Sequence, residues 1–231
     1  MSVTSEFSIL AIPFLFMLSG IEKEQVHNHL DVLDEKQEDL ERAEKIETEE
    51  IFPEELQPIS SEMTYHEWKA AEDEAEDFYE KSDGLFKKDW GVFMSYHAHN
   101  KDIDPAIVYE LLSVETGETF DPDLVGPQTK YGRAYGMAQF MTNTGPWIAD
   151  MADIAYEKDF LYNPYYSMRL SVEYLDYLHD KYDGDWNKAL TAYHRGVAGM
   201  SAYVEEHGDA KSWYAVEIQE KAEDRELVAK E

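Results

Sequence analysis

One acidic residue interrupts the apolar pattern of a predicted helix. In the segment AIVYELLSVETGETFDP, Val108, Leu111 and Leu112 form a stripe at i, i+3 and i+4, and the next position of that stripe is Glu115. Burial on this stripe disfavours the charged form of the carboxyl group. The negative end of the helix dipole, just before Gly117, acts in the same direction. Glu115 is therefore expected to have a raised pKa, which is what a general acid needs near neutral pH.

Taken alone, the periodicity favours a simpler interpretation, in which a Glu at the helix terminus extends its side chain into solvent. A single carboxylate out of pattern is a weak indication of a functional site. The general-acid hypothesis for Glu115 therefore depends on what the rest of the chain supplies.

Composition excludes several classes of function. The 231 residues include 50 acidic and 20 basic ones, for a net charge of −30. A chain this acidic, without a basic cluster, repels nucleic acid and anionic lipid. There is no cysteine, which excludes disulfides, thiolate metal sites and Cys nucleophiles. At 43% hydrophobic residues the chain can form a core.

The chain divides into three parts by composition. Residues 1–21 contain the apolar block FSILAIPFLFMLSGI, which fits a signal peptide or membrane anchor, although no Lys or Arg precedes it. The alternative is an apolar helix packed on the domain. Residues 22–61 form an acidic spacer, helical or disordered. An export segment predicts a protein of the cell envelope or the extracellular space, with this segment as its membrane tether if it is not cleaved.

Residues 62–231 are expected to form an all-α globular domain. Helix starts are marked by a capping residue followed by Pro or Glu, and helix ends by Gly. The only strand feature is a short irregular β-hairpin expected between Phe120 and Tyr135. The predicted start signals are Thr64 with Glu67, Asp104-Pro105, Asn163-Pro164 and Asp185, and the last helix is expected to begin near Lys211.

Two stretches downstream of Glu115 form, together with the segment around Glu115, an ordered series of three motifs. They are YGRAYGMAQFMTNTGPW, with Gly136-Met137-Ala138-Gln139-Phe140 and Thr144, and ALTAYHRGVAG, with Ala192-Tyr193-His194-Arg195-Gly196. Together with Glu115-Thr116-Gly117, they resemble the Slt-type soluble lytic transglycosylase domain, a relative of goose-type lysozyme. The resemblance covers about residues 100–215, and it is the order of the three blocks that makes it specific.

The resemblance implies a lysozyme-like fold and cleavage of the β-1,4 bond between N-acetylmuramic acid and N-acetylglucosamine in peptidoglycan. Glu115 would act as both acid and base, and a 1,6-anhydro ring would form on the muramic acid. No cofactor is implied. The implied substrate-binding residues are Thr116, Gly136, Met137, Gln139, Phe140, Thr144, Tyr193 and His194.

Individual roles and alternatives follow from the same resemblance. Gly136 would let the backbone pass close to a sugar, Met137, Gln139 and Phe140 would line the subsites, and the Tyr193 hydroxyl would hold Glu115. Met137 and Phe140 fit core positions equally well, and Tyr193 fits a buried aromatic residue whose hydroxyl is hydrogen-bonded.

The chain departs from the family pattern at a few positions. Thr116 stands where Ser is usual, and Asn163 replaces an Asp before Pro164. Ser167 or Met168 and Ser171 occupy positions where the family tends to have Asn and Gly. The most consequential change is His194 in place of an Asn expected to contact sugar, because His adds a titration near neutral pH.

Two alternative functions stay open on the sequence. One is a lysozyme-type hydrolase, for which Glu118, Asp121 or Asp123 would have to supply a second carboxylate. The other is a non-catalytic wall-binding or structural component of a secretion, conjugation or phage apparatus.

Two histidine pairs have spacings that could serve a metal. These pairs are His97-x-His99 and His27-x-His29, and neither has a third ligand nearby in the sequence. Solvent-exposed histidines are the favoured interpretation, and no metal site is predicted.

Overall fold

The computed structural model describes residues 64–228. The predictions for residues 1–21 and 22–61, and the pair His27-x-His29, lie outside the described residues. Within the described part, no helix combines the length and the apolar character needed to cross a membrane.

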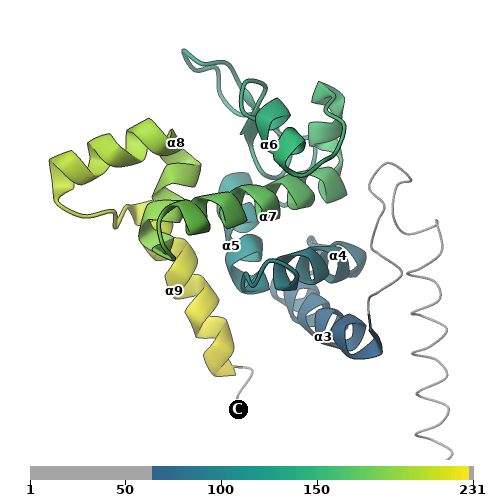
Figure 1. Cartoon of the computed structure of the whole chain (residues 1–231). Helices are drawn as coiled ribbons and strands as arrows, with labels where there is room; N and C mark the ends of the chain where they lie inside the picture. Colours follow the sequence, from purple (N-terminus) through teal and green to yellow (C-terminus); the bar gives the residue numbers. More distant parts are fainter. Residues whose placement is uncertain (1–63, 229–231) are drawn as a thin grey trace, which may run out of the picture. The chain divides into compact units, whose positions relative to one another are not determined.

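The described part of the chain is all-α, as predicted, with one small antiparallel hairpin (Figure 1). In chain order its elements are α3 (Tyr65–Lys81), α4 (Lys88–His99), α5 (Pro105–Thr116), β1 (Ala134–Tyr135), β2 (Phe140–Met141), α6 (Gly145–Met151), the 3₁₀-helix η2 (Lys158–Tyr162), α7 (Pro164–Lys181), α8 (Trp186–His207) and α9 (Trp213–Val228).

The helices begin where the capping signals predict. Thr64 forms a reciprocal capping box with Glu67 at the start of α3. The side chains of Asp104, Asn163 and Asp185 accept backbone N–H bonds at the starts of α5, α7 and α8. These contacts satisfy amide groups that have no partner inside the helix.

Helix ends agree with the sequence less completely. Gly117 caps α5 in the left-handed conformation, as expected. The helix predicted to start at Asp185 should, by the rule that helices end at Gly, stop near Gly196. Helix α8 instead continues to His207 after a kink at Gly196, which adopts φ 74° and ψ 161°. The last helix begins at Trp213, close to the predicted Lys211.

The β-hairpin lies slightly later in the chain than the sequence suggests. Its strands pair Ala134 with Met141 and Tyr135 with Phe140. The predicted segment contributes two isolated bridges, Val125 with Tyr135 and Thr129 with Gly132. The strands are only two residues long, so backbone pairing alone does not stabilise them and they depend on packing against α7 and η2.

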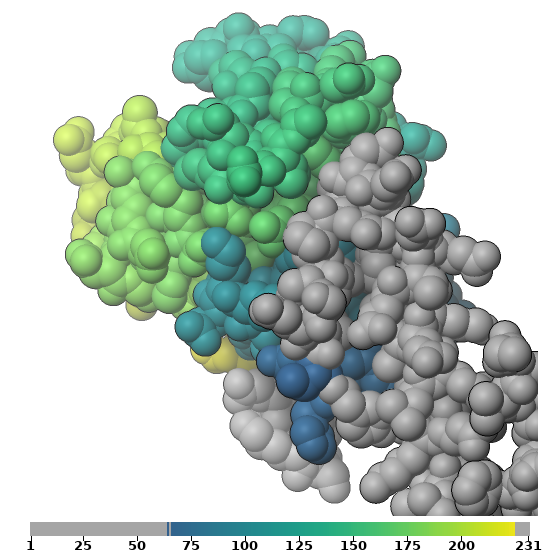
Figure 2. Space-filling model, turned by 45° about the vertical axis from the view of Figure 1, so that its right-hand side comes forward, coloured from purple at the N-terminus to yellow at the C-terminus, as the bar shows by residue number. Residues whose placement is uncertain are grey.

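Helix α7 is the element to which most others are attached. It packs on α4, α8, α6 and η2, while α5 packs on α4 and α9. In the space-filling view of Figure 2, the atoms of α6 and α7 form one continuous surface. Apolar side chains from different helices fill the centre, and among those fully buried are Phe93, Leu111, Leu112, Met168 and Leu175.

Substitution of Gly136 tests how closely the β-hairpin packs on η2. It has φ +73°, and a Cβ added there would lie 1.8 Å from the Leu161 carbonyl oxygen of η2. We expect Gly136→Ala to lower the free energy of unfolding by about 3 kcal/mol or more, because backbone strain and a backbone clash add. Gly208→Ala is the matched control, since Gly208 has φ +87° but no atom near its absent Cβ.

For Gly208→Ala we expect a loss of only about 1 kcal/mol, the cost of the left-handed conformation alone. Urea unfolding followed by circular dichroism measures both variants. Equal losses in the two variants would mean that the contact with Leu161 does not restrict this position.

Candidate active site

Glu115 lies in the last turn of α5 and retains some exposed surface while protein atoms crowd its carboxyl group. Burial raises the pKa of Glu115 from 4.5 to about 7, and the hydrogen bond from Tyr214 opposes part of that rise. The carboxyl group is therefore half protonated close to neutral pH. The structure thus places at this position a residue that can both donate and accept a proton.

Tyr214 is the direct partner of Glu115. Its hydroxyl donates a 2.7 Å hydrogen bond to Glu115 Oε1, and its side chain is 1% exposed. The ring of His194 stacks on the ring of Tyr214, with centroids 4.7 Å apart and an interplanar angle of 11°. Tyr214 therefore links the carboxyl group of α5 to the segment of α8 that carries the Ala-Tyr-His block.

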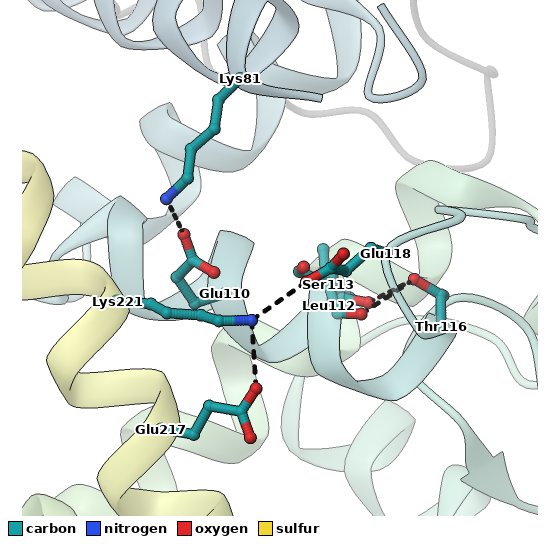
Figure 3. Close-up of polar contacts among 8 residues, drawn as sticks. All are labelled: Lys81, Glu110, Leu112, Ser113, Thr116, Glu118, Glu217 and Lys221. Carbon is teal, nitrogen blue, oxygen red and sulfur yellow. Dashed lines mark hydrogen bonds and ion pairs between the residues drawn. The ribbon is translucent and has the colours of Figure 1, made fainter. Parts of the chain in front are cut away.

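Ion pairs between α5 and α9 support this arrangement (Figure 3). Lys221 of α9 lies 3.2 Å from Glu118, just past the end of α5, and 3.1 Å from Glu217 on its own helix. In the middle of α5, Lys81 of α3 pairs with the buried carboxylate of Glu110 at 2.6 Å. Ion pairs thus join the middle of α5 to α3, and the turn that follows α5 to α9.

Glu115 opens into a cavity of about 670 Å³. A cavity of this volume is within the range for small-molecule sites. Its walls come from the 129–131 turn, the β-hairpin, α7 and the kinked part of α8, and they include most of the predicted site residues: Glu115, Gln139, Phe140, Thr144, Tyr193 and His194.

Gln139 and Phe140 help to shape the wall of the cavity. Gln139 has φ 50°, and its side-chain amide donates to the carbonyl groups of Leu124 and Gly136. The ring of Phe140 is 3% exposed and packs against Tyr174 and Tyr193. Both residues therefore border the cavity and also stabilise the hairpin.

The hydrogen bond to Glu115 that was predicted for Tyr193 comes from Tyr214. The Tyr193 hydroxyl donates to the Ala138 carbonyl oxygen at 3.2 Å and lies 3.5 Å from Ser171 Oγ. Tyr193 is close enough for the charge of Glu115 to raise its pKa, an effect second to that of burial. It lines the cavity, but the hydrogen bond to Glu115 comes from a residue far along the chain.

Three predicted substrate-binding residues lie outside the cavity lining. The Thr116 hydroxyl donates to the Leu112 carbonyl oxygen and accepts from the Phe120 amide, so it supports the turn after α5 (Figure 3). Met137 is fully buried and belongs to the core. Gly136 packs closely on η2, where a Cβ would lie 1.8 Å from the Leu161 carbonyl oxygen.

The carboxylates considered as partners of Glu115 are not in the cavity wall. Glu118 is exposed and pairs with Lys221. Asp121 is exposed and accepts a hydrogen bond from the Asp123 amide, as is typical of a turn residue. Among the described residues, Glu115 is the only carboxylate that lines this cavity.

His97 differs from its predicted exposed position. It is 5% exposed, and its Nδ1 lies 2.8 Å from the Arg169 guanidinium. Burial, followed by the charge of Arg169, lowers its pKa to about 3, so its ring is neutral. His99 is exposed and pairs with Glu74. Residues 64–228 contain no cluster of three or more His, Asp or Glu side chains suited to a metal ion.

Several cavity residues were not identified from the sequence. Tyr131, Tyr174 and Arg195 line the cavity, and Tyr214 binds Glu115. Arg195 lies inside the Ala-Tyr-His block, so the sequence could have identified it as a residue of the site. For Tyr214 the sequence offers only an aromatic pair near the start of the last helix, and nothing in the local sequence relates this residue to Glu115.

An all-α fold with one shielded carboxyl group beside a cavity is typical of lysozyme-like glycan-cleaving proteins. The family model described as "Transglycosylase SLT domain" matches residues 93–216, which is more than half of the chain. The chain belongs to the transglycosylase SLT family, in agreement with the resemblance seen in its sequence.

Comparison with solved structures gives a distant match. It is the X-ray structure of an inactive mutant of the lytic transglycosylase Slt from Pseudomonas aeruginosa, with 14% sequence identity and a TM-score of 0.45. The match covers 72% of this chain and 38% of that chain, so this chain spans well under half of the other protein. No curated protein sequence matches the chain.

The raised pKa of Glu115 predicts a pH-dependent cost in stability. The folded protein keeps the proton of Glu115 up to about pH 7, whereas the unfolded chain releases it near pH 4.5. Stability is therefore lost as the pH rises between these values, by about 3 kcal/mol. We expect Glu115→Gln to gain about this amount in unfolding free energy, relative to the native protein, between roughly pH 4 and pH 8.

Urea unfolding across this pH range measures the difference, and the general repulsion among acidic residues cancels between the two proteins. Glu118→Gln is the control, because Glu118 is exposed. A Glu115→Gln difference that stays constant with pH would contradict a raised pKa.

Loss of the hydrogen bond from Tyr214 is expected to change the pKa of Glu115. Because this bond stabilises the carboxylate, Tyr214→Phe should raise the pKa of Glu115 further, by about one pH unit for one hydrogen bond. Tyr193→Phe removes an equivalent hydroxyl that donates to Ala138, and we expect a much smaller change. NMR titration of the Glu115 carboxyl carbon measures both, and an equal effect of the two variants would exclude a specific role for Tyr214.

Proposed function

We propose that the chain is a peptidoglycan lytic transglycosylase that cleaves the β-1,4 bond between N-acetylmuramic acid and N-acetylglucosamine. The observation that carries the proposal is a carboxyl group with a pKa of about 7, alone among carboxylates in the described wall of the cavity. Membership of the SLT family supports the class of substrate.

The proposed reaction uses Glu115 twice. The protonated carboxyl group donates its proton to the glycosidic oxygen as the bond from C1 of the muramic acid to that oxygen breaks. The resulting carboxylate then accepts the proton of the C6 hydroxyl while the C6 oxygen bonds to C1. The products are a free N-acetylglucosamine end and a 1,6-anhydro-muramic acid end, and Glu115 regains its proton.

A pKa near 7 suits both halves of this cycle. A group of this pKa is populated in the acid form and is still a competent base after it has lost the proton. Tyr214 stabilises the carboxylate that forms in the middle of the cycle by donating to Oε1. A single-carboxyl mechanism also agrees with a described cavity wall that lacks Glu118, Asp121 and Asp123, since hydrolysis by a carboxylate pair needs a second group.

His194 would lie against the bound glycan. It lines the cavity and stacks on Tyr214, and partial burial together with the neighbouring Arg195 lowers its pKa. The ring is therefore neutral at neutral pH, so it offers one donor and one acceptor to a sugar, as an Asn side chain does. The substrate also requires a location outside the cytoplasmic membrane, and we propose export to the cell envelope through the N-terminal apolar segment.

Digestion of purified peptidoglycan followed by mass spectrometry tests the proposal. We expect anhydro-muropeptides from the native protein, and a loss of roughly 10³-fold or more in rate for Glu115→Gln, since the substitution removes the only acid and base. Asp121→Asn serves as the matched control and should keep its activity, because Asp121 is exposed and outside the cavity wall.

Other products would point to the alternatives. Reducing muramic acid ends would indicate a lysozyme-type hydrolase. Glycan binding without turnover by the intact native protein would indicate a non-catalytic wall-binding component. Full activity of Glu115→Gln would contradict the assignment of the acid.

A further inference from the structure

The charge of the Glu115 cavity is opposite to that of the chain. The sequence has 50 acidic and 20 basic residues, yet the described cavity wall contains only one carboxylate, Glu115, beside Lys130, His194 and Arg195. A second cavity, of about 480 Å³, has the acidic wall that the composition of the chain leads one to expect. Its lining includes Glu74, Asp77, Asp102 and Asp104. The basic wall of the first cavity is thus a local exception.

Within residues 64–228, the two permanent cations of this wall form no ion pair with a carboxylate. In the part of the chain that the structure describes, ion pairs engage many other basic residues, including Lys81, Lys101 and Lys221, but neither Lys130 nor Arg195. In a chain with such an excess of carboxylates, two unpaired cations beside one cavity leave a positive field at that point.

Aromatic rings hold these cations in place of carboxylates. Lys130 Nζ lies 4.7 Å from the centroid of the Tyr131 ring, and the Arg195 guanidinium lies 4.7 Å from that of Tyr203. A cation–π contact restrains the side chain without cancelling its charge. The positive groups therefore remain available to an anion from outside the protein.

The backbone presents the two cations from segments far apart in the sequence. Lys130 and Tyr131 form the tip of a tight turn, in which Thr129 and Gly132 exchange backbone hydrogen bonds of 2.9 and 3.2 Å. Arg195 immediately precedes Gly196, whose non-helical conformation kinks α8. Both segments border the same cavity, so an anionic group on a ligand bound there is within the field of both.

Resting on the proposed function, we propose that Lys130 and Arg195 bind the carboxylates of the stem peptides carried by the glycan. Where a stem peptide is attached, the lactyl group of the muramic acid is an amide and the sugars are neutral, so the anionic groups nearest to the reacting bond belong to those peptides. Arg and Lys favour carboxylates through charge-assisted hydrogen bonds. The cavity would therefore select peptide-bearing strands with free carboxylates over strands whose peptide carboxylates are amidated.

The test compares two glycan substrates, both treated with hydrofluoric acid to remove phosphodiester-linked wall polymers. They are strands with stem peptides and the same strands with their carboxylates amidated by carbodiimide and ammonia. For the native protein at low salt, we expect kcat/KM for the carboxylate form to exceed that for the amidated form about fivefold, the size expected of two exposed charge contacts.

In the double variant Lys130→Gln, Arg195→Gln this ratio should fall to about one, and added salt should lower it in the native protein. Lys181→Gln is the matched control, since Lys181 is an exposed lysine of α7 that contacts Tyr177 and lies outside the described cavity wall. It should keep the native ratio. Circular dichroism establishes that each variant is folded.

A native ratio of one, or an unchanged ratio in the double variant, would overturn the inference while leaving the proposed cleavage intact. Discrimination seen only in material not treated with hydrofluoric acid would overturn it in favour of phosphate recognition. If no substrate gives anhydro products, the proposed function fails. Binding of the carboxylate and amidated fragments by Glu115→Gln, measured by calorimetry, then decides the inference on its own.

Discussion

The hydrogen bond from Tyr214 to Glu115 is the contact on which the rest of the site depends. It joins the end of α5 to the start of α9, two segments separated by 99 positions in the chain. Burial alone would push the pKa of Glu115 higher than about 7, and the Tyr214 hydroxyl opposes that rise. The result is a carboxyl group that changes its charge readily, which is the property that proton transfer in both directions requires.

Much of the helical framework can be understood as support for this one contact. The ion pair of Lys221 with Glu118 joins α9 to the turn after α5, and Lys81 neutralises Glu110 in the middle of α5. A buried carboxylate such as Glu110 would be costly without a partner. The stacking of His194 on Tyr214 then extends the connection to α8. The helices α3, α5, α8 and α9 therefore share the task of keeping Glu115 in one position.

The cavity combines a tightly packed part and an exposed part. Its inner wall consists of packed aromatic rings from Phe140, Tyr174 and Tyr193, which give a fixed shape. Its outer edge includes the exposed turn residues Lys130 and Tyr131. A fixed interior around the reacting bond and a charged, exposed edge are consistent with a polymeric substrate that extends beyond the site. This division also separates the groups proposed for catalysis from those proposed for selection.

The sequence by itself determined the features that depend on neighbouring residues. Capping side chains such as Asp104 and Asn163 satisfy nearby amide groups, so the helix starts were predictable, and the periodicity around Glu115 showed that a carboxylate stands where the pattern calls for an apolar residue. The order of the three motifs identified the family. The sequence also placed Gln139, Phe140, Tyr193 and His194 at a common site, and the structure brings them to one cavity.

Only the tertiary structure decided which groups touch one another. It assigned the partner of Glu115 to Tyr214 instead of Tyr193, gave Gly136 and Thr116 structural contacts, and placed Lys130 and Arg195 on the same cavity. The physical reason is that hydrogen bonds, burial and unpaired charge between distant segments are set by helix packing. A helix start depends on atoms within one turn of the chain, whereas the pKa of Glu115 depends on a hydroxyl that lies 99 residues away in sequence.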